Sequence, residues 1–325
     1  MTARTRRAPL VAVLAAVSAL ALGACTSSSD IESAAATQAA GADALVVDTS
    51  PDQDRVHTEP NQEAIDLLPP GLVDDGVLRV ATTPFSAPLD FYADDNTTPI
   101  GNETDIAQLV ADALDLELEL VPTAWENWPL ATQSGEVDAT VANVTVTEER
   151  KQLFDFSSYR VDELGFLTTA GSDLTVDEPA DVAGHTVAVG SGTNQEKILL
   201  AWDAQNRAAG LDPVDVQYYQ NDSDVTLALQ SGRVELYFGP NATAAYKAAT
   251  APDDFQVVGT VNGGWPDTAQ IAVATAKGNG LAPAFTAALN GAIADGSYAE
   301  VLERWGLGSE AIDESQTNPP GLAAS

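Results

Sequence analysis

One arginine and one loop carry the residue types best suited to holding an anion. Arg150 follows an apolar run and a short turn, Thr147-Glu148-Glu149. Its guanidinium is a planar fork of N–H donors that can hold a carboxylate through two hydrogen bonds. Residues 191–194, Ser-Gly-Thr-Asn, stand between a predicted strand and a predicted helix. Free N–H groups at a helix start attract anions. Arg150 could instead pair with Glu148 or Glu149 at the surface, and such turns cap many helices, so both alternatives stay open.

Two further polar residues, Asn143 and Thr145, lie at the end of the same apolar run. They could face a cleft or simply cap the end of a strand. His57 falls in a polar stretch and His185 at the start of a predicted strand, so neither is expected to be catalytic. No His-Glu-x-x-His, P-loop or Gly-x-Ser-x-Gly string occurs, and residues 190–192 lack nucleophile-elbow spacing. We therefore expect no catalytic residue and no enzyme activity.

The composition of the chain excludes several classes of protein. Its 325 residues include 14 Lys or Arg and 48 Asp or Glu, a net charge of −34. Such a surface repels phosphate backbones, so we expect no nucleic-acid partner. A single Cys and two His argue against a disulfide within the chain and against a cysteine or histidine metal centre. We expect neither metal nor cofactor. Apolar residues, at 45%, suffice for the core of one or two domains.

The N-terminus reads as a targeting segment. Arg4, Arg6 and Arg7 precede an uncharged apolar run over residues 10–24, which is too short to span a bilayer comfortably. Leu22-Gly23-Ala24-Cys25 resembles the bacterial lipobox, in which the Cys thiol receives a lipid and becomes the first residue of the mature chain. A signal peptide with a chance Cys is the alternative. We expect a signal peptide over 1–24, lipidation of Cys25, and an extracytoplasmic protein anchored to the bacterial cell membrane.

Polar segments are expected on either side of the folded region. Residues 25–75 are rich in Ala, Asp, Gln and Pro, and we expect a flexible tether there. Residues 309–325 are similar in character and are expected to form a loose tail. Loss of residues 1–24, which hold three Arg and no acidic residue, leaves 11 basic and 48 acidic residues and a net charge of −37.

Strands and helices alternate between these two segments. Residues 77–82 predict a strand, 103–114 an amphipathic helix, and alternating Leu and Glu over 116–120 another strand. Alternation of this kind is typical of an α/β fold with mostly parallel sheets. Residues 130–138 (LATQSGEVD) resemble residues 227–235 (LALQSGRVE), each with a Gly where a helix ends. This repeat suggests two similar lobes, although helix–Gly–strand units recur in many α/β proteins.

Several long motifs in order resemble the family 3 extracellular solute-binding proteins of bacterial ABC importers, specifically the polar amino-acid group. The longest covers residues 133–157 (QSGEVDATVANVTVTEERKQLFDFS). Others are 101–107 (GNETDIA), 184–193 (GHTVAVGSGT) and 295–305 (DGSYAEVLERW). The resemblance spans residues 77–307, nearly all of the region expected to be ordered.

The resemblance implies a type II periplasmic-binding-protein clamshell, each lobe a mostly parallel sheet flanked by helices. Lobe 1 would comprise 76–165 and 270–308, and lobe 2 would comprise 166–269, with crossings near 165–167 and 265–268. It also implies a monomer that captures a small polar, carboxylate-bearing, amino-acid-like ligand and delivers it to an ABC permease, touching the membrane through its lipid only. Alternatives are a dehydratase-like enzyme on the same fold and a ligand-sensing subunit of a receptor.

The resemblance further implies a set of ligand-binding residues. Arg150 would grip the ligand carboxylate, Thr193 and Asn194 would complete that site from lobe 2, and Trp125 would cover the ligand. The remaining implied positions are Asn143, Thr145, Thr83, Ser86 and Asn241.

The chain departs from the family pattern in two places. Relatives that bind α-amino acids usually carry an Asp where this chain has Pro240, and an acidic residue where it has Thr83. Asn241, Asp267 or Asp90 could substitute as the ammonium partner, or the ligand is not a simple α-amino acid. Arg160 stands where relatives often have paired aromatics, and could be a second anion contact or a rim residue.

Overall fold

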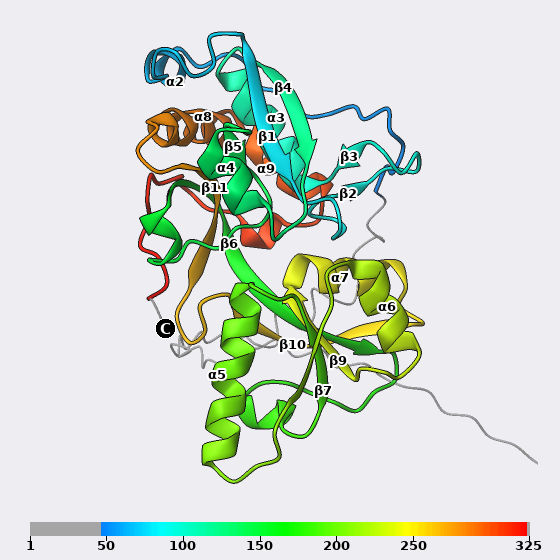
Figure 1. Ribbon diagram of the computed structural model, residues 1–325. Helices are drawn as coiled ribbons and strands as arrows, with labels where there is room; N and C mark the ends of the chain where they lie inside the picture. The colour runs from blue at the N-terminus through cyan, green and yellow to red at the C-terminus, as the bar shows by residue number, and fades with distance from the viewer. Residues whose placement is uncertain (1–46, 324–325) are drawn as a thin grey trace, which may run out of the picture. The chain divides into compact units, whose positions relative to one another are not determined.

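A computed structural model of the chain describes residues 47–323 (Figure 1). A mixed sheet runs through this region in the order β4-β1-β5-β11-β6-β9-β7-β8, and β10 pairs with β6 beside that path. The predictions for residues 77–82, 103–114 and 116–120 are confirmed by β1, α3 and β4. The strands are β1 (Val77–Thr82), β4 (Glu117–Pro122), β5 (Ala139–Thr140), β6 (Phe154–Thr169), β7 (Thr186–Val189), β8 (Asp215–Tyr218), β9 (Leu236–Pro240), β10 (Phe255–Asn262) and β11 (Ala269–Ala276), with the hairpin β2 (Phe91–Tyr92) and β3 (Pro99–Ile100) apart.

The first lobe is built on the parallel strands β4, β1 and β5. Helices α3 (Asn102–Ala113), α8 (Leu281–Asp295) and α9 (Ser297–Arg304) pack against one another beside it, as Figure 1 shows, and α4 (Trp128–Ser134) packs on β11. The apolar positions of α3 recur every three or four residues, so Ile106, Leu109 and Val110 all face the core and are buried. They join one continuous core with residues of β1, α8 and α9.

The second lobe repeats this plan with the parallel strands β8, β7 and β9. Its helices are α5 (Asn194–Ala208), α6 (Asp222–Gln230) and α7 (Asn241–Thr250). Phe166, Trp202 and Phe238 stack within its core, with the rings of Phe166 and Phe238 centred 4.1 Å apart. The two copies of the sequence repeat fall in corresponding places. The end of α4 leads through Gly135 to β5, and the end of α6 leads through Gly232 to β9, both glycines having positive φ.

Antiparallel pairings join the two parallel sets. Residues 154–162 of β6 pair with β11, and residues 163–169 pair with β10, so this strand passes from one lobe into the other. The chain returns between Asn262 and Ala269. Gly263 donates its N–H to the carbonyl of Asp162 at 2.7 Å, and a Cβ here would clash with the Asp162 side chain. Only glycine fits so close an approach.

Two segments that we expected to be mobile are packed on the first lobe. In residues 47–75, Arg55 pairs with Asp105 at 2.6 Å, and the short helix α2 (Gln62–Asp66) packs on α8. In residues 309–323, Glu310 is buried and Thr317 bridges to β6. The expected tether and loose tail are thus corrected for these residues. Composition did not predict this packing, because it depends on a few polar side chains that form ion pairs and caps, such as Arg55 with Asp105 and Asn61 at the start of α2.

The remaining N-terminal predictions, namely the signal peptide over 1–24, lipidation of Cys25 and the tether through 46, lie outside the described residues, as do residues 324–325. Within residues 47–323, the helices are all too short or too polar to cross a membrane. The same region contains no group of three His, Cys, Asp or Glu side chains arranged to hold a metal ion.

Candidate functional site

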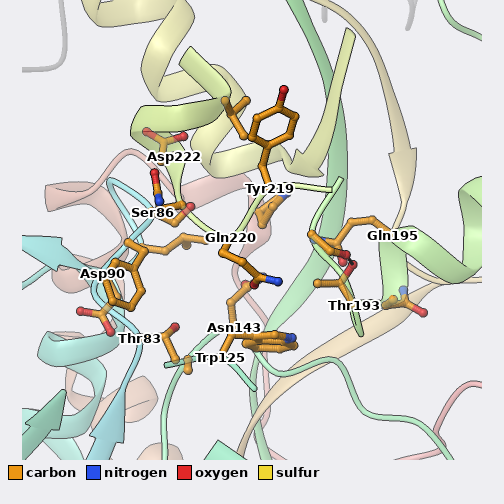
Figure 2. Close-up of a pocket in the computed structure, with 18 of the residues that line it drawn as sticks. Thr83, Ser86, Asp90, Trp125, Asn143, Thr193, Gln195, Tyr219, Gln220 and Asp222 are labelled. Carbon is orange, nitrogen blue, oxygen red and sulfur yellow. Dashed lines mark hydrogen bonds between the residues drawn. The ribbon is translucent and has the colours of Figure 1, made fainter. Parts of the chain in front are cut away.

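A pocket lined by both lobes gathers most of the residues singled out from the sequence. Figure 2 shows Thr83, Ser86, Trp125, Asn143 and Thr193 among the side chains around it. Eight of the nine expected ligand-binding residues line this pocket: Thr83, Ser86, Trp125, Asn143, Thr145, Arg150, Thr193 and Asn194. Asn241 is not among the lining residues, although its neighbour Pro240 is.

Arg150 points its guanidinium into the pocket from a short 3-10 turn that follows residues 141–147. Nη1 donates to the carbonyl of Thr145 at 2.8 Å and Nη2 to the carbonyl of Gly192 at 3.5 Å. The guanidinium also lies over the ring of Trp125, 5.7 Å from its centre, which favours a cation there. Burial lowers the pKa of Arg150 to about 10, although the negative charges of Asp162 and Glu149 oppose this shift. The guanidinium is therefore charged at neutral pH.

No carboxylate pairs with Arg150 within 4 Å in residues 47–323. The surface alternative is wrong for this structure, because both neighbouring acids are engaged elsewhere. Glu148 pairs with Lys151 at 2.8 Å and Glu149 with Lys197 at 2.5 Å. A partly buried guanidinium without a carboxylate is therefore free to accept an anion from outside the protein.

The loop from the second lobe brings a helix start to the same end of the pocket. Thr193 caps α5: its Oγ1 accepts from the N–H of Glu196 at 3.2 Å and donates to the carbonyl of Gly190 at 2.7 Å. The side chain of Asn194 is occupied as well, donating to the carbonyl of Gly263. This loop can therefore offer an anion the positive end of a 15-residue helix, together with the first backbone N–H groups of that helix.

Asn143 and Thr145 use their side chains to build the pocket wall. Asn143 adopts a left-handed backbone (φ 53°), and its Oδ1 accepts from Arg160 at 2.5 Å. Thr145 donates its hydroxyl to Asp162 at 2.7 Å while its carbonyl receives Arg150. These contacts hold both residues in place. Only those polar atoms of the two residues that are not engaged in these contacts could bind a ligand directly.

Carboxyl groups line the other side of the pocket. Figure 2 shows Asp90 near Thr83 and Asp222 near Ser86, across from Thr193 and Gln195. Asp90 is 2% exposed, and neither of its oxygens forms a well-aligned hydrogen bond within the described residues. Burial and the nearby Glu103 raise its pKa well above the usual range. The pocket therefore has a cationic end and an acidic end.

The other two pocket acids already have cationic partners. Glu103 pairs with the buried Arg160 at 2.9 Å. Asp222 pairs with Lys247 at 2.6 Å; burial raises the pKa of Asp222, and Lys247 opposes that shift. Arg160 is thus neither an anion contact nor a rim residue, and both expectations for it were wrong. At 1% exposure it lies inside the lobe between two carboxylates, Glu103 and Glu310.

The loop that follows β1, residues 83–90, contacts both α6 and α7 across the pocket. Ser86 Oγ lies 2.9 Å from Thr243 Oγ1 on α7, and the N–H of Asp222 donates to the carbonyl of Phe85 at 3.3 Å. The pair of Lys197 with Glu149 adds a third contact between the lobes. These three contacts between the lobes are all polar.

Sequence reasoning missed the loop between β8 and α6. Tyr219, Gln220, Asn221 and Asp222 all line the pocket, and Figure 2 shows Gln220 reaching into its interior. A signal for this loop was present: β7 and β8 are parallel, so the loops after both strands leave the same edge of the sheet. Since residues 190–194 follow β7, residues 219–222 had to lie beside them.

Two of the three residues considered as substitutes at the ammonium position lie away from the pocket. Asn241 begins α7 beside Gly165, and Asp267 lies near the returning crossing. The side chain of Asn241 lies beside Gly165 of β6 and not along the pocket, so a part for it in ligand binding stays a prediction. Asp90 is the one of the three that lines the pocket.

Two α/β lobes joined by crossing strands, with a polar pocket between them, define a two-lobed binding fold. The chain belongs to the bacterial extracellular solute-binding proteins, family 3, which it matches over residues 78–308. The predicted resemblance, fold class and extent are thereby confirmed.

Known proteins of this kind are similar over most of their length. The L-cystine-binding protein TcyJ of Escherichia coli K12 is 30% identical over 235 residues, covering 71% of this chain and 82% of TcyJ. The arginine-binding protein ArgT of Corynebacterium glutamicum is 25% identical over 270 residues, covering 83% of this chain and 87% of ArgT.

Solved structures agree with this assignment. An ancestral arginine-binding protein bound to arginine is 28% identical with a TM-score of 0.62, covering 71% of this chain and 98% of that one. The ancestral amino acid-binding protein AncCDT-1 is described as a precursor of cyclohexadienyl dehydratase. It shares the fold at 24% identity and a TM-score of 0.62, covering 72% of this chain and 97% of that one.

Proposed function

We propose that this protein binds a small zwitterionic, amino-acid-like ligand in the pocket between its lobes. The observation that carries the proposal is the guanidinium of Arg150, which faces the pocket without a carboxylate partner among the described residues. The start of α5 lies beside it. A ligand carboxylate there would gain a bidentate charged pair and the helix dipole together.

The acidic side of the pocket supports a cationic group at the other end of the ligand. Asp90 is the pocket acid without an ion-pair partner in residues 47–323, and its raised pKa reflects a buried carboxyl in need of a counter-charge. An ammonium group would supply that charge. We therefore assign to Asp90 the part that the residue at position 240 plays in relatives, since Pro240 has no charge.

We further propose that the protein delivers its ligand to the permease of an ABC importer, as a monomer held at the outer face of the bacterial cell membrane through a lipid on Cys25. The family membership and the amino-acid-binding relatives support an extracytoplasmic import role. The n-region arginines and the Leu-Gly-Ala-Cys string support the anchor. Deleting the permease gene nearest to this one should then abolish ligand uptake without changing ligand binding by the purified protein.

A dehydratase-like enzyme is the second candidate. One fold relative is described as the precursor of a dehydratase, and Asp90 is a buried carboxyl of raised pKa, a feature that can serve general acid catalysis. Turnover of prephenate-like acids by the purified protein, abolished in Asp90→Asn, would favour the enzyme. Saturable binding without product formation favours the binding protein.

The decisive experiment is a ligand screen on residues 26–325, because residues 47–75 and 309–323 are packed on the first lobe. Thermal-shift and calorimetric titrations should test the amino acids, arginine and cystine first, with each hit repeated as its carboxamide and as its decarboxylated amine. We expect amino acids to bind and their carboxamides to bind far more weakly. If carboxamides bind as tightly as the acids, or no amino acid binds, the proposed function is wrong.

A further inference from the structure

The last described residues, 309–323, form a strap that lies beyond the matched family region 78–308. We use the name C-terminal strap for this segment. It pairs with β6 through an antiparallel bridge, Ser157 to Thr317, in which the N–H of Ser158 donates to the carbonyl of Gln316 at 3.1 Å. It then pairs in parallel with the run before Arg150, through a bridge from Thr147 to Leu322.

The end of the strap fixes the turn that carries Arg150. The N–H of Leu322 donates to the carbonyl of Val146 at 3.0 Å, and the N–H of Glu148 donates to the carbonyl of Leu322 at 2.8 Å. The N–H of Gly321 donates to Glu148 Oε1 at 2.9 Å. The turn closes when the N–H of Arg150 donates to Thr147 Oγ1 at 3.0 Å. The backbone on the N-terminal side of Arg150 is thus held by the strap.

The start of the strap contacts the pocket wall through Arg160. Glu310 pairs with Arg160, whose Nη2 reaches both Glu103 Oε1 at 2.9 Å and Asn143 Oδ1 at 2.5 Å. Glu103 and Asn143 line the pocket, and the main-chain N–H of Asn143 donates back to Glu103 at 3.3 Å. Glu310, Arg160 and Glu103 are all at most 2% exposed. A buried cation needs each of its acceptors, so loss of Glu310 would disturb the two groups that share Arg160.

We propose that the C-terminal strap is a positioning element of the ligand pocket, with Leu322 holding the Arg150 turn and Glu310 holding Asn143 through Arg160. The inference rests on the proposed function for its effect on ligand binding. The structural part of the proposal, that the strap orders residues 143–150, does not depend on the proposed function. A strap that only stabilises the fold would lower the melting temperature and leave the geometry of the pocket, and hence ligand preference, unchanged.

The test compares four variants of residues 26–325 with the parent. A chain ending at Pro319 removes the pairing at Leu322 and keeps Glu310. Glu310→Ala removes an acceptor of Arg160, whereas Glu310→Gln keeps a hydrogen-bond acceptor there. The amide resembles the protonated carboxyl, and burial raises the pKa of Glu310 to about 7. Glu314→Gln, in the same segment but exposed, is the matched control.

Two readouts are needed, both taken well below the melting temperature of each variant. Hydrogen exchange of the ligand-free protein reports the amide of Glu148. We expect exchange at least about tenfold faster in the chain ending at Pro319, because its acceptor is gone. Calorimetry reports the ratio of affinities for an amino acid and its carboxamide. We expect that ratio to fall about tenfold in the chain ending at Pro319 and in Glu310→Ala, and to be largely restored in Glu310→Gln.

The outcomes separate the two proposals. If the parent binds no amino acid, the proposed function fails, and exchange at Glu148 still decides whether the strap orders the Arg150 turn. If exchange and the affinity ratio both match the parent in the shortened chain and in Glu310→Ala, the positioning role is overturned. Should the shortened chain fail to fold, Leu322→Pro takes its place and is judged by the affinity ratio. It removes the donor to Val146 but keeps the Leu322 carbonyl that accepts from the N–H of Glu148, so an affinity ratio equal to that of the parent in this variant and in Glu310→Ala would overturn the positioning role.

Discussion

Replacing Arg150 is the most direct test of the pocket. Its guanidinium is partly buried, stacked over Trp125 and without a carboxylate partner in the described residues. Truncating one member of a buried charge pair costs about 2–5 kcal/mol of binding, partly because the other charge is left unpaired. Arg150→Ala should therefore weaken binding of an amino acid by about 30-fold to 5,000-fold. Arg150→Lys should recover only part, since an ammonium cannot reproduce the two-pronged contact.

The same substitution should leave the fold nearly intact. Arg150 makes one short hydrogen bond, to the carbonyl of Thr145, so the change in unfolding free energy should be about 1 kcal/mol. Arg233→Ala, an exposed arginine away from the pocket, is the matched control and should bind like the parent. Calorimetric titration of all three variants with the ligand found in the screen gives the result. Arg150→Ala binding within threefold of the parent would refute a carboxylate contact at this residue.

Four further outcomes are expected. Residues 26–325 hold 11 basic and 48 acidic residues, and self-repulsion at this net charge of −37 should make the melting temperature rise with moderate salt, since the Debye length is about 10 Å at 0.1 M. A flat or falling response without ligand would contradict this. The pKa of Asp90 is raised in the folded state, so its protonated form stabilises the fold fully below the ordinary value of 3.8 and less as pH rises through the folded pKa. A ligand cation would lower that pKa. At pH values between the lower pKa of the ligand-bound form and the higher pKa of the ligand-free form, binding should therefore release a proton, and affinity should increase with pH. This release would be seen as a buffer-dependent heat that disappears in Asp90→Asn. Trp125→Ala removes a ring that faces Arg150 and should weaken binding about fivefold to tenfold by titration, whereas the parent affinity would show that the ring does not cover the ligand. Cys25→Ala should stay unprocessed or leave the membrane fraction, and mass spectrometry finding an unmodified N-terminus at another residue of the parent would count against lipidation.

Local patterns in the sequence predicted the elements well. The strand at 77–82 and the helix at 103–114 appear within one residue of the expected bounds, because alternation and helical spacing follow from the geometry of the chain itself. The repeat around Gly135 and Gly232 also appears as expected, since a positive φ after a helix strongly favours glycine. Most of the pocket residues were predicted from motifs, because the order of these motifs along the chain is typical of one fold.

The failures all concern contacts between segments distant in sequence. Arg160 was expected to be a second anion contact or a rim residue. The partner that makes its burial possible, Glu310, lies 150 residues away in a segment expected to be loose. The loop at 219–222 was missed because its place beside residues 190–194 depends on strand pairing and not on its own residues. Neither fact can be inferred from a window of neighbouring residues.

The three acidic residues that line the pocket differ in whether an ion-pair partner already neutralises them, and this difference decides which of them can bind a ligand cation. Glu103 has Arg160 and Asp222 has Lys247, so each already lies in a neutralised pair whose charge would change little when a ligand enters. Asp90 has no ion-pair partner within residues 47–323, and burial holds its pKa high. Among the three it is therefore the carboxyl that gains most from an incoming cation, while Arg150 at the other end gains most from an incoming anion. A ligand that carries both charges satisfies both groups at once, and one that carries a single charge leaves a buried group uncompensated.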